Sequence, residues 1–155
     1  MTKRMVMTNY RSILAVILAV VTTLLVSCGS PTAKVLPTYT AQQIEQIQNV
    51  AATISALRST MPVLEGKIQD RNWTDVRTYI HGPFGELRQK MSSLARQLLP
   101  QEQKAAISAS KDLFNRLQSL DLAAEKGSYE AAITSYRAAV KDFDEFLRLV
   151  PQERT

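Results

Sequence analysis

Apolar residues recur at every third or fourth position through most of the chain after residue 40. This spacing is the period of an α-helix that buries one face and leaves the other in solvent. The pattern divides into four segments, separated by short stretches that contain Pro, Gly or Asn. We predict helices over residues 40–68, 73–99, 100–124 and 129–150.

Each segment carries one apolar stripe, so packing between helices must supply most of the stability. Short connections make consecutive helices antiparallel neighbours. The sequence therefore predicts an all-α fold, an up-down-up-down four-helix bundle over residues 40–155. The stripes are Ile44, Ile47, Ala51, Ile54, Leu57, Met61, Leu64 and Ile68; Trp73, Val76, Ile80, Phe84, Leu87, Met91, Leu94 and Leu98; Ala106, Ala109, Leu113, Leu117, Leu120 and Ala124; and Tyr129, Ile133, Tyr136, Val140, Phe143, Leu147 and Val150.

Local signals predict where the helices begin and where two of them break. Thr40 and Gln43 have the spacing of a capping box, which would begin the first helix. Pro62 has no backbone N–H to donate, so we expect a kink or break near Thr60. The run HGPFG over residues 81–85 should bend the second segment. Further caps are expected at Asn72, Gly127 and Ser128.

The first 28 residues follow the plan of a bacterial lipoprotein signal peptide. Basic residues precede an apolar run over residues 13–26, which is shorter than the ~20 residues of a membrane-spanning helix. The tetrapeptide Leu25-Val26-Ser27-Cys28 resembles a lipobox, in which the cysteine thiol receives lipid and the chain is cut before it. We therefore predict that residues 1–27 are removed and that Cys28 carries the lipid, palmitate among its acyl chains. The alternative is a retained membrane anchor with an incidental cysteine.

Residues 28–39 connect the predicted anchor to the predicted bundle. They contain Pro31 and Pro37 among Ser and Thr, and they show no apolar period. We interpret them as a short, flexible, lipidated tether, whose ~12 steps from Cys28 to Thr40 span roughly 40 Å at most. Two or more acyl chains hold a protein stably on a membrane. The bundle would therefore act within that distance of the bilayer.

The charge of the chain changes this interpretation little. The formal net charge is +5, from 19 basic and 14 acidic residues, but three of the basic residues lie in residues 1–27 and no acidic residue does. The remainder therefore has 16 basic against 14 acidic residues, a net charge of +2. Charges of both signs are interspersed along every segment. A nucleic-acid-binding domain concentrates basic residues on one face, so we expect no nucleic-acid partner.

Residues that carry enzymatic or metal chemistry are sparse. The chain has one cysteine and one histidine, and it contains no GxSxG, P-loop, HExxH or CxxCH motif. A zinc site normally needs three or four protein ligands, so we interpret His81 as a surface residue in the bend. The acidic residues Asp142, Asp144 and Glu145 point in different directions on a helix, which favours a solvated face over a calcium site. We predict no enzyme activity, no metal and no cofactor.

Trp73 and the bend over residues 80–85 are the features that helix formation alone does not account for. Trp73 is the only tryptophan, and a Gly-Pro bend lowers helix stability. The bend either allows the helix to pack or shapes a docking surface. Tryptophan is found both in cores and at the centres of interfaces, so both interpretations stay open here.

Three stretches of the chain share the pattern of one known family. They are residues 73–88 (WTDVRTYIHGPFGELR), Leu98-Leu99-Pro100 before an Ala-rich helix, and residues 136–147 (YRAAVKDFDEFL) before Pro151. In these stretches the chain resembles the PsbQ family. The resemblance covers roughly residues 40–151, and the lipobox of this chain points to the cyanobacterial branch.

The resemblance implies a role that the residue pattern does not. Members of the family are non-catalytic extrinsic subunits of photosystem II, on the lumenal side of the thylakoid membrane, and they stabilise the oxygen-evolving complex. By resemblance, the partners would be the inner-antenna chlorophyll protein and the manganese-stabilising extrinsic protein. We select Trp73, Arg77 and Arg88 as candidates for contacting acidic lumenal surfaces. The alternatives are an envelope lipoprotein acting as a chaperone or ligand-binding adaptor, and a small metal-binding bundle.

Overall fold

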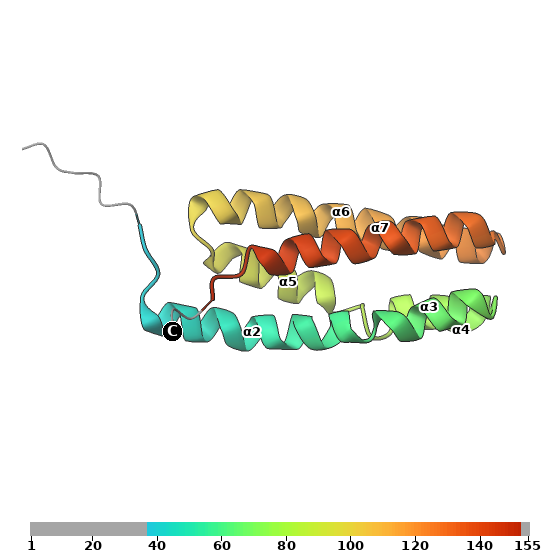
Figure 1. Cartoon of the computed structure of the whole chain (residues 1–155), viewed down its shortest axis with the longest axis horizontal. Coiled ribbons are helices and arrows are strands. Elements are labelled where there is room, and N and C mark those ends of the chain that lie inside the picture. Colours follow the sequence, from blue (N-terminus) through green and yellow to red (C-terminus); the bar gives the residue numbers. More distant parts are fainter. Residues whose placement is uncertain (1–36, 153–155) are drawn as a thin grey trace, which may run out of the picture. The chain divides into compact units, whose positions relative to one another are not determined.

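The computed structural model describes residues 37–152, which form six helices and, within that range, no strand (Figure 1). Because the helices lie end to end in two places, they make four arms. The first arm is α2 with α3, the second is α4 with α5, and the third and fourth are α6 and α7. The bounds are α2 Ala41–Ser59, α3 Met61–Gln69, α4 Trp73–His81, α5 Leu87–Gln97, α6 Pro100–Glu125 and α7 Tyr129–Arg148.

The four arms pack as the up-down-up-down bundle that the sequence predicts. The third arm, α6, contacts both halves of the second arm as well as α7. The fourth arm, α7, contacts both halves of the first arm, α2 and α3. The halves of the two broken arms pair with one another, α2 with α5 and α3 with α4. The all-α four-helix prediction is confirmed for the described residues.

The predicted caps lie at the helix ends, although the Ser128 side chain makes no cap hydrogen bond at the start of α7. Thr40 and Gln43 form a complete capping box at the start of α2. The Asn72 side chain accepts a hydrogen bond from the Asp75 backbone N–H at the start of α4. Gly127 ends the α6 region with a φ of 65°, the left-handed conformation that glycine adopts without strain.

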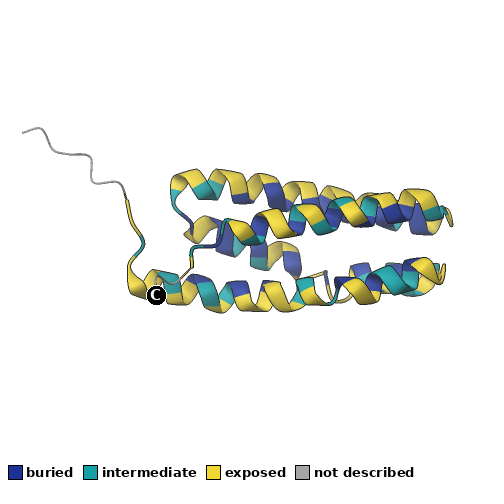
Figure 2. Cartoon of the chain, in the orientation of Figure 1, coloured by how far each residue is buried: buried dark blue, intermediate teal, exposed yellow. Residues whose placement is uncertain are grey.

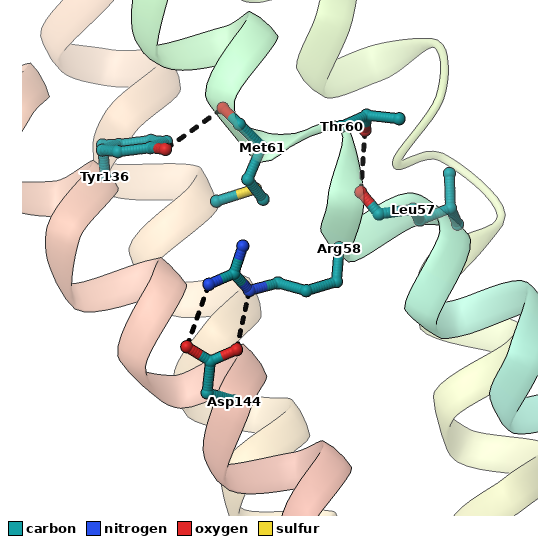
Figure 3. A network of polar contacts seen from close by, with 6 residues as sticks. All are labelled: Leu57, Arg58, Thr60, Met61, Tyr136 and Asp144. Atoms are coloured by element: carbon teal, nitrogen blue, oxygen red, sulfur yellow. Dashed lines mark hydrogen bonds and ion pairs between the residues drawn. The ribbon is translucent and has the colours of Figure 1, made fainter.

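The first arm breaks where Pro62 requires it. Helix α2 ends at Ser59, and α3 begins at Met61 with Pro62 in its first turn. The Thr60 hydroxyl donates to the Leu57 carbonyl oxygen over 2.7 Å, which satisfies an acceptor at the end of α2 (Figure 3).

Helix α7 holds both sides of this break. Arg58 donates two hydrogen bonds to the Asp144 carboxylate, Nε to Oδ1 over 2.7 Å and Nη2 to Oδ2 over 2.9 Å (Figure 3). The Tyr136 hydroxyl lies 3.1 Å from the Met61 carbonyl oxygen, to which it donates (Figure 3). Hydrogen bonds to α7 therefore hold the residues on both sides of the break, Arg58 and Met61.

The second arm bends over residues 82–86, as the HGPFG run predicts. The Gly85 backbone N–H donates to the Gly82 carbonyl oxygen over 3.0 Å, which closes a tight turn. Phe84 points inward and is 3% exposed. The rings of Phe84 and Tyr79 pack in a T-shaped arrangement with their centroids 5.7 Å apart. The bend is therefore anchored in the core by Phe84, while its other residues are exposed.

The buried residues follow the predicted stripes in most positions, and each arm turns its exposed side outward (Figure 2). The stripe prediction was too narrow on the last two arms, because it omitted Phe114, Ala132, Ala139 and Phe146, all of which are buried. The stripe prediction also included several residues that are only half-buried at the edges of the core. These are Ile44, Leu57, Trp73, Tyr129, Val140 and Leu147.

Several predictions fall on residues that the structure does not describe. The signal peptide over residues 1–27, the lipobox cysteine Cys28 and most of the predicted tether lie outside the described range. The last residue of the predicted tether, Tyr39, lies within the described range and packs against the core. Across residues 37–152 there is no helix whose length and apolar character suit it to crossing a bilayer.

Candidate partner-binding surface

Two of the three predicted docking residues line one cleft between α4 and α6. Trp73, Arg77 and His81 are spaced four residues apart, so they lie along one side of α4. The cleft, of about 500 Å³, is open on this side, and we call it the Trp73 cleft. Its lining residues are Trp73, Thr74, Arg77, Thr78, His81, Ala124 and Glu125.

One carboxylate on α6 organises the polar part of the Trp73 cleft. The same oxygen, Asp121 Oδ1, lies 3.1 Å from Arg77 Nε and 3.0 Å from His81 Nε2. The Asp121 side chain is 18% exposed, whereas Arg77 and His81 are 44% and 65% exposed. Asp121 therefore orients both outer side chains from beneath and partly compensates the charge of Arg77. The sequence prediction missed Asp121, because nothing in its spacing shows that α6 faces α4 at this level.

Trp73 belongs both to the core and to this surface. It is half-buried, packs against the core cluster and lines the cleft with part of its ring. A Cβ added at Gly127 would stand 3.5 Å from Trp73 Nε1, so the indole lies directly against the turn between α6 and α7. The sequence left open whether Trp73 packs in the core or contributes to a docking surface. In the structure it packs against the core and also lines the cleft.

The structure places Arg88 away from the Trp73 cleft. Arg88 is an exposed residue in the first turn of α5, and its guanidinium carbon lies 4.2 Å from the centre of the Phe114 ring on α6. No ion pair involves Arg88 within residues 37–152. The three docking candidates thus form two separate groups. Trp73 and Arg77 line the Trp73 cleft, where Asp121 compensates the charge of Arg77, whereas Arg88 stands apart and has no ion pair in the described residues.

The predicted solvated face near the end of α7 holds for Asp144 and Glu145, which are exposed, and is wrong for Asp142, which is half-buried. Asp144 binds Arg58 of the first arm. Asp142 is 19% exposed, and its Oδ2 lies 3.5 Å from Arg116 Nε on α6. The third residue, Glu145, pairs only with its helix neighbour Arg148, over 3.4 Å. The acids of α7 therefore face two different neighbouring helices.

Potential metal ligands are scattered in the part of the chain that the structure describes. No three of its His, Cys, Asp or Glu side chains come together as a metal would require. The His81 ring is hydrogen-bonded to Asp121 through Nε2.

A second, larger cleft of about 810 Å³ lies at the other end of the bundle, where the two termini of the domain meet. Tyr39 Oη accepts the Leu99 backbone N–H over 2.8 Å, and Gln48 donates to the Pro151 carbonyl oxygen. Burial, opposed by the Leu99 hydrogen bond, raises the pKa of the Tyr39 hydroxyl. Tyr39 thereby fixes the start of the domain to the turn between α5 and α6, and Gln48 fixes the end of the domain to α2.

Comparison with known proteins gives two concordant results. The family model PsbQ, described as oxygen evolving enhancer protein 3, matches residues 2–151. A curated relative, CyanoQ of Synechocystis sp. (strain ATCC 27184 / PCC 6803 / Kazusa), is 44% identical over 147 residues. That alignment covers 94% of this chain and 99% of the relative.

Proposed function

The chain belongs to the PsbQ family, and we propose from this membership that it is an extrinsic, lumenal subunit of photosystem II that stabilises the oxygen-evolving complex. The observation that carries the proposal is the match over residues 2–151, which includes every described helix. The family role is non-catalytic, and the proposal assigns no reaction to the chain.

The bundle supports such a role through its surfaces. It offers the Trp73 cleft, whose aromatic ring and oriented Arg77 are the kinds of groups enriched at the centres of interfaces. A rigid bundle that covers a neighbouring protein limits exchange of solvent and ions beneath it. We propose that the neighbours are the inner-antenna chlorophyll protein and the manganese-stabilising extrinsic protein.

The proposed location depends on Cys28. We propose that the chain is cut before Cys28, that lipid on this residue holds it to the lumenal side of the thylakoid membrane, and that residues 28–39 tether the bundle. The sequence Leu25-Val26-Ser27-Cys28 supports this proposal. A tether raises the effective concentration of the bundle at the membrane, so a modest docking surface suffices for high occupancy.

The decisive experiment is purification of photosystem II through an affinity tag on one of its core subunits, from gently solubilised thylakoids. The proposal predicts that this chain co-purifies with active complexes in a defined ratio. Its absence from active, intact complexes would overturn the proposal. Recovery with unrelated envelope proteins would instead favour a chaperone or adaptor.

The Trp73 cleft provides a site-directed test of docking. We predict that Arg77→Glu weakens retention on photosystem II by about tenfold, because it places a carboxylate beside Asp121 and reverses the outer charge. Trp73→Ala should also weaken retention, but it removes core contacts as well. Circular dichroism of each variant must therefore show the wild-type helix content and melting temperature. Unchanged retention of a folded Arg77→Glu variant would remove this cleft from the interface.

A further inference from the structure

Four basic side chains lie on the packed helices α5 and α6, and none of them lines the Trp73 cleft. Arg88 and Arg96 lie on α5, Lys104 and Lys111 lie on α6, and all four are exposed. Ile107, one of the few large apolar side chains on the described surface, is 53% exposed and lies between the two lysines in sequence. We call this surface the basic seam, made of Arg88, Arg96, Lys104, Ile107, Lys111 and Phe114.

The register of two antiparallel helices brings these residues together. The contact of Arg88 with Phe114 marks one level at which α5 lies against α6. Lys111 precedes Phe114 by three residues, so these two side chains are neighbours one turn apart on α6. Arg96 lies two turns beyond Arg88, which places it roughly level with Ile107.

The α6 side of the seam is continuous. Lys104, Ile107 and Lys111 are spaced by three and four residues, which places them on one side of the helix. The outward side of α6 is a row of exposed residues along its length (Figure 2). An incoming surface therefore meets an apolar side chain flanked by two ammonium groups.

The fold does not compensate these charges. No carboxylate in residues 37–152 forms an ion pair with any of the four cations. Asp112 follows Lys111 but is turned about 100° away around the helix, and the nearby Glu86 pairs with Lys90 over 3.6 Å. By contrast, Arg58, Arg77 and Arg116 each have a carboxylate partner on a facing helix.

Arg88 is held in an orientation suited to a carboxylate. Its guanidinium group stacks on Phe114, which is 7% exposed and fixed in the core. No hydrogen bond within the described residues uses the Arg88 nitrogens. A stacked guanidinium loses less side-chain freedom on binding, and it presents paired N–H donors that match a carboxylate.

From these observations we propose that the basic seam docks on an acidic protein surface, with carboxylates on Arg88 and Lys111 and an apolar contact at Ile107. The inference rests on the proposed function only for the identity of the partner, the lumenal surface of photosystem II. A lipid surface fits less well, because a helix that lies in a bilayer needs a broad apolar face. The seam offers Ile107 alone between its cations.

The test measures the salt concentration that releases the native chain from photosystem II in isolated complexes. Arg88→Glu and Lys111→Glu should each lower the release concentration and weaken retention about tenfold at fixed salt. Arg88→Lys, which keeps the charge but loses the planar stacked group, should lie between wild type and Arg88→Glu. The matched control is Arg137→Glu, the same charge change at an exposed residue of α7 that has no ion pair in the described residues.

The outcomes separate this inference from the proposed function. If the wild-type chain does not associate with photosystem II, the proposed function fails before the seam is tested. If the wild type associates and Arg88→Glu and Arg137→Glu release alike, the seam is not the docking surface. Salt-dependent binding of the wild type to anionic lipid vesicles without photosystem II, lost in Arg88→Glu, would also overturn a protein partner. Ile107→Asp keeps the test valid if Arg88→Glu alters folding, since Ile107 is exposed.

Discussion

Charged side chains in this bundle act between helices more than along them. Asp144 and Asp121 each accept a hydrogen bond from the Nε atom of an arginine on another arm. In Arg58 the hydrogen bond to Asp144 is also the main reason that the guanidinium pKa is raised. Such pairs orient neighbouring helices, but their exposure to solvent limits how much they stabilise the fold.

The Arg58–Asp144 pair allows this limit to be measured. We predict that a double-mutant cycle with Arg58→Gln and Asp144→Asn gives a coupling free energy of about 0.5–1 kcal/mol, at the upper end for exposed pairs because two hydrogen bonds form. Urea denaturation at low and high salt provides the measurement, and the coupling should shrink as salt rises. A coupling near zero at low salt would show that the pair does not fasten the break to α7.

Tyr136 gives the bundle a dependence on alkaline pH. Burial first, and the Glu65 carboxylate second, raise the pKa of Tyr136 to about 12. In the unfolded chain the hydroxyl has its ordinary pKa of about 10, so the folded state holds the proton more tightly. The resulting stability is complete below pH 10 and is lost as the pH rises toward 12.

We therefore predict that stability falls between pH 10 and about 12 in the wild type and that Tyr136→Phe makes this fall shallower. At neutral pH the variant should lose about 0.5–1.5 kcal/mol, because the hydrogen bond to the Met61 carbonyl is gone. Denaturation curves at several pH values, with ultraviolet absorbance of tyrosinate, measure both effects. The matched control is Tyr79→Phe, and an equal change of slope in that variant would contradict the assignment.

At the scale of helices, two glycines show how backbone space differs between a helix interior and a bend. Gly66 lies within α3, and a Cβ added there would meet nothing within 4 Å. A Cβ added at Gly85 would stand 2.8 Å from the His81 carbonyl oxygen, closer than real contacts allow. The glycine of the bend is therefore required, and the glycine of the helix is not.

The two alanine substitutions should consequently change stability in opposite directions. Gly66→Ala should stabilise the bundle by about 0.5–1 kcal/mol, because alanine has the higher helix propensity and a more restricted unfolded chain. Gly85→Ala should destabilise it by about 1–3 kcal/mol, because the turn must open to admit the Cβ. Thermal and urea unfolding of the pair measure the difference, and equal effects at the two sites would contradict this account of the bend.

The helices themselves were largely predictable, because their signals are local. Pro62, the HGPFG run, Asn72 and Gly127 each act within one or two turns, and each marks a boundary in the structure. The apolar period also indicated which face of each helix is buried. It underestimated α6 and α7, where Phe114 and Phe146 extend the buried face beyond one stripe, because these long helices contact more than one neighbour.

Contacts between helices were not predictable from the same signals. The partners of Arg77 and Asp144 depend on how far one helix is shifted along another, and the apolar period does not fix this shift. The same applies to the basic seam. Its cations come from two helices, α5 and α6, and only the packing of these helices brings Arg88 over the Phe114 ring.

At the scale of the whole molecule, the two candidate docking surfaces differ in how they respond to salt. The Trp73 cleft combines an aromatic ring with a compensated arginine, whereas the basic seam has four cations without carboxylate partners in the described residues. Screening by salt weakens uncompensated surface charge most. Sensitivity to salt therefore distinguishes the contributions of the two surfaces to docking.

The proposed lipid anchor at Cys28 would raise the occupancy of these docking surfaces without adding a contact between the bundle and its partner. We predict that Cys28→Ser blocks lipid attachment, because the modification requires a thiol, and leaves an unacylated precursor with residues 1–27 in place. Mass spectrometry of the chain from native membranes provides the measurement. The matched control, Ser27→Ala, keeps a small residue beside the cut and should be processed normally. A wild-type chain that begins elsewhere and carries no lipid would contradict the prediction.

Loss of the anchor should lower occupancy without changing which residues dock. An anchor confined to the membrane supplies an effective concentration that a free chain lacks, so a chain that is exported without lipid and begins at Gly29 should occupy few photosystem II complexes at native expression. Raising its expression should restore occupancy by mass action, and Arg88→Glu should abolish that rescue while Arg137→Glu should not. Quantitative mass spectrometry of purified complexes measures each step. If high expression fails to restore occupancy, the lipid contributes more than local concentration, and the docking surfaces are insufficient alone.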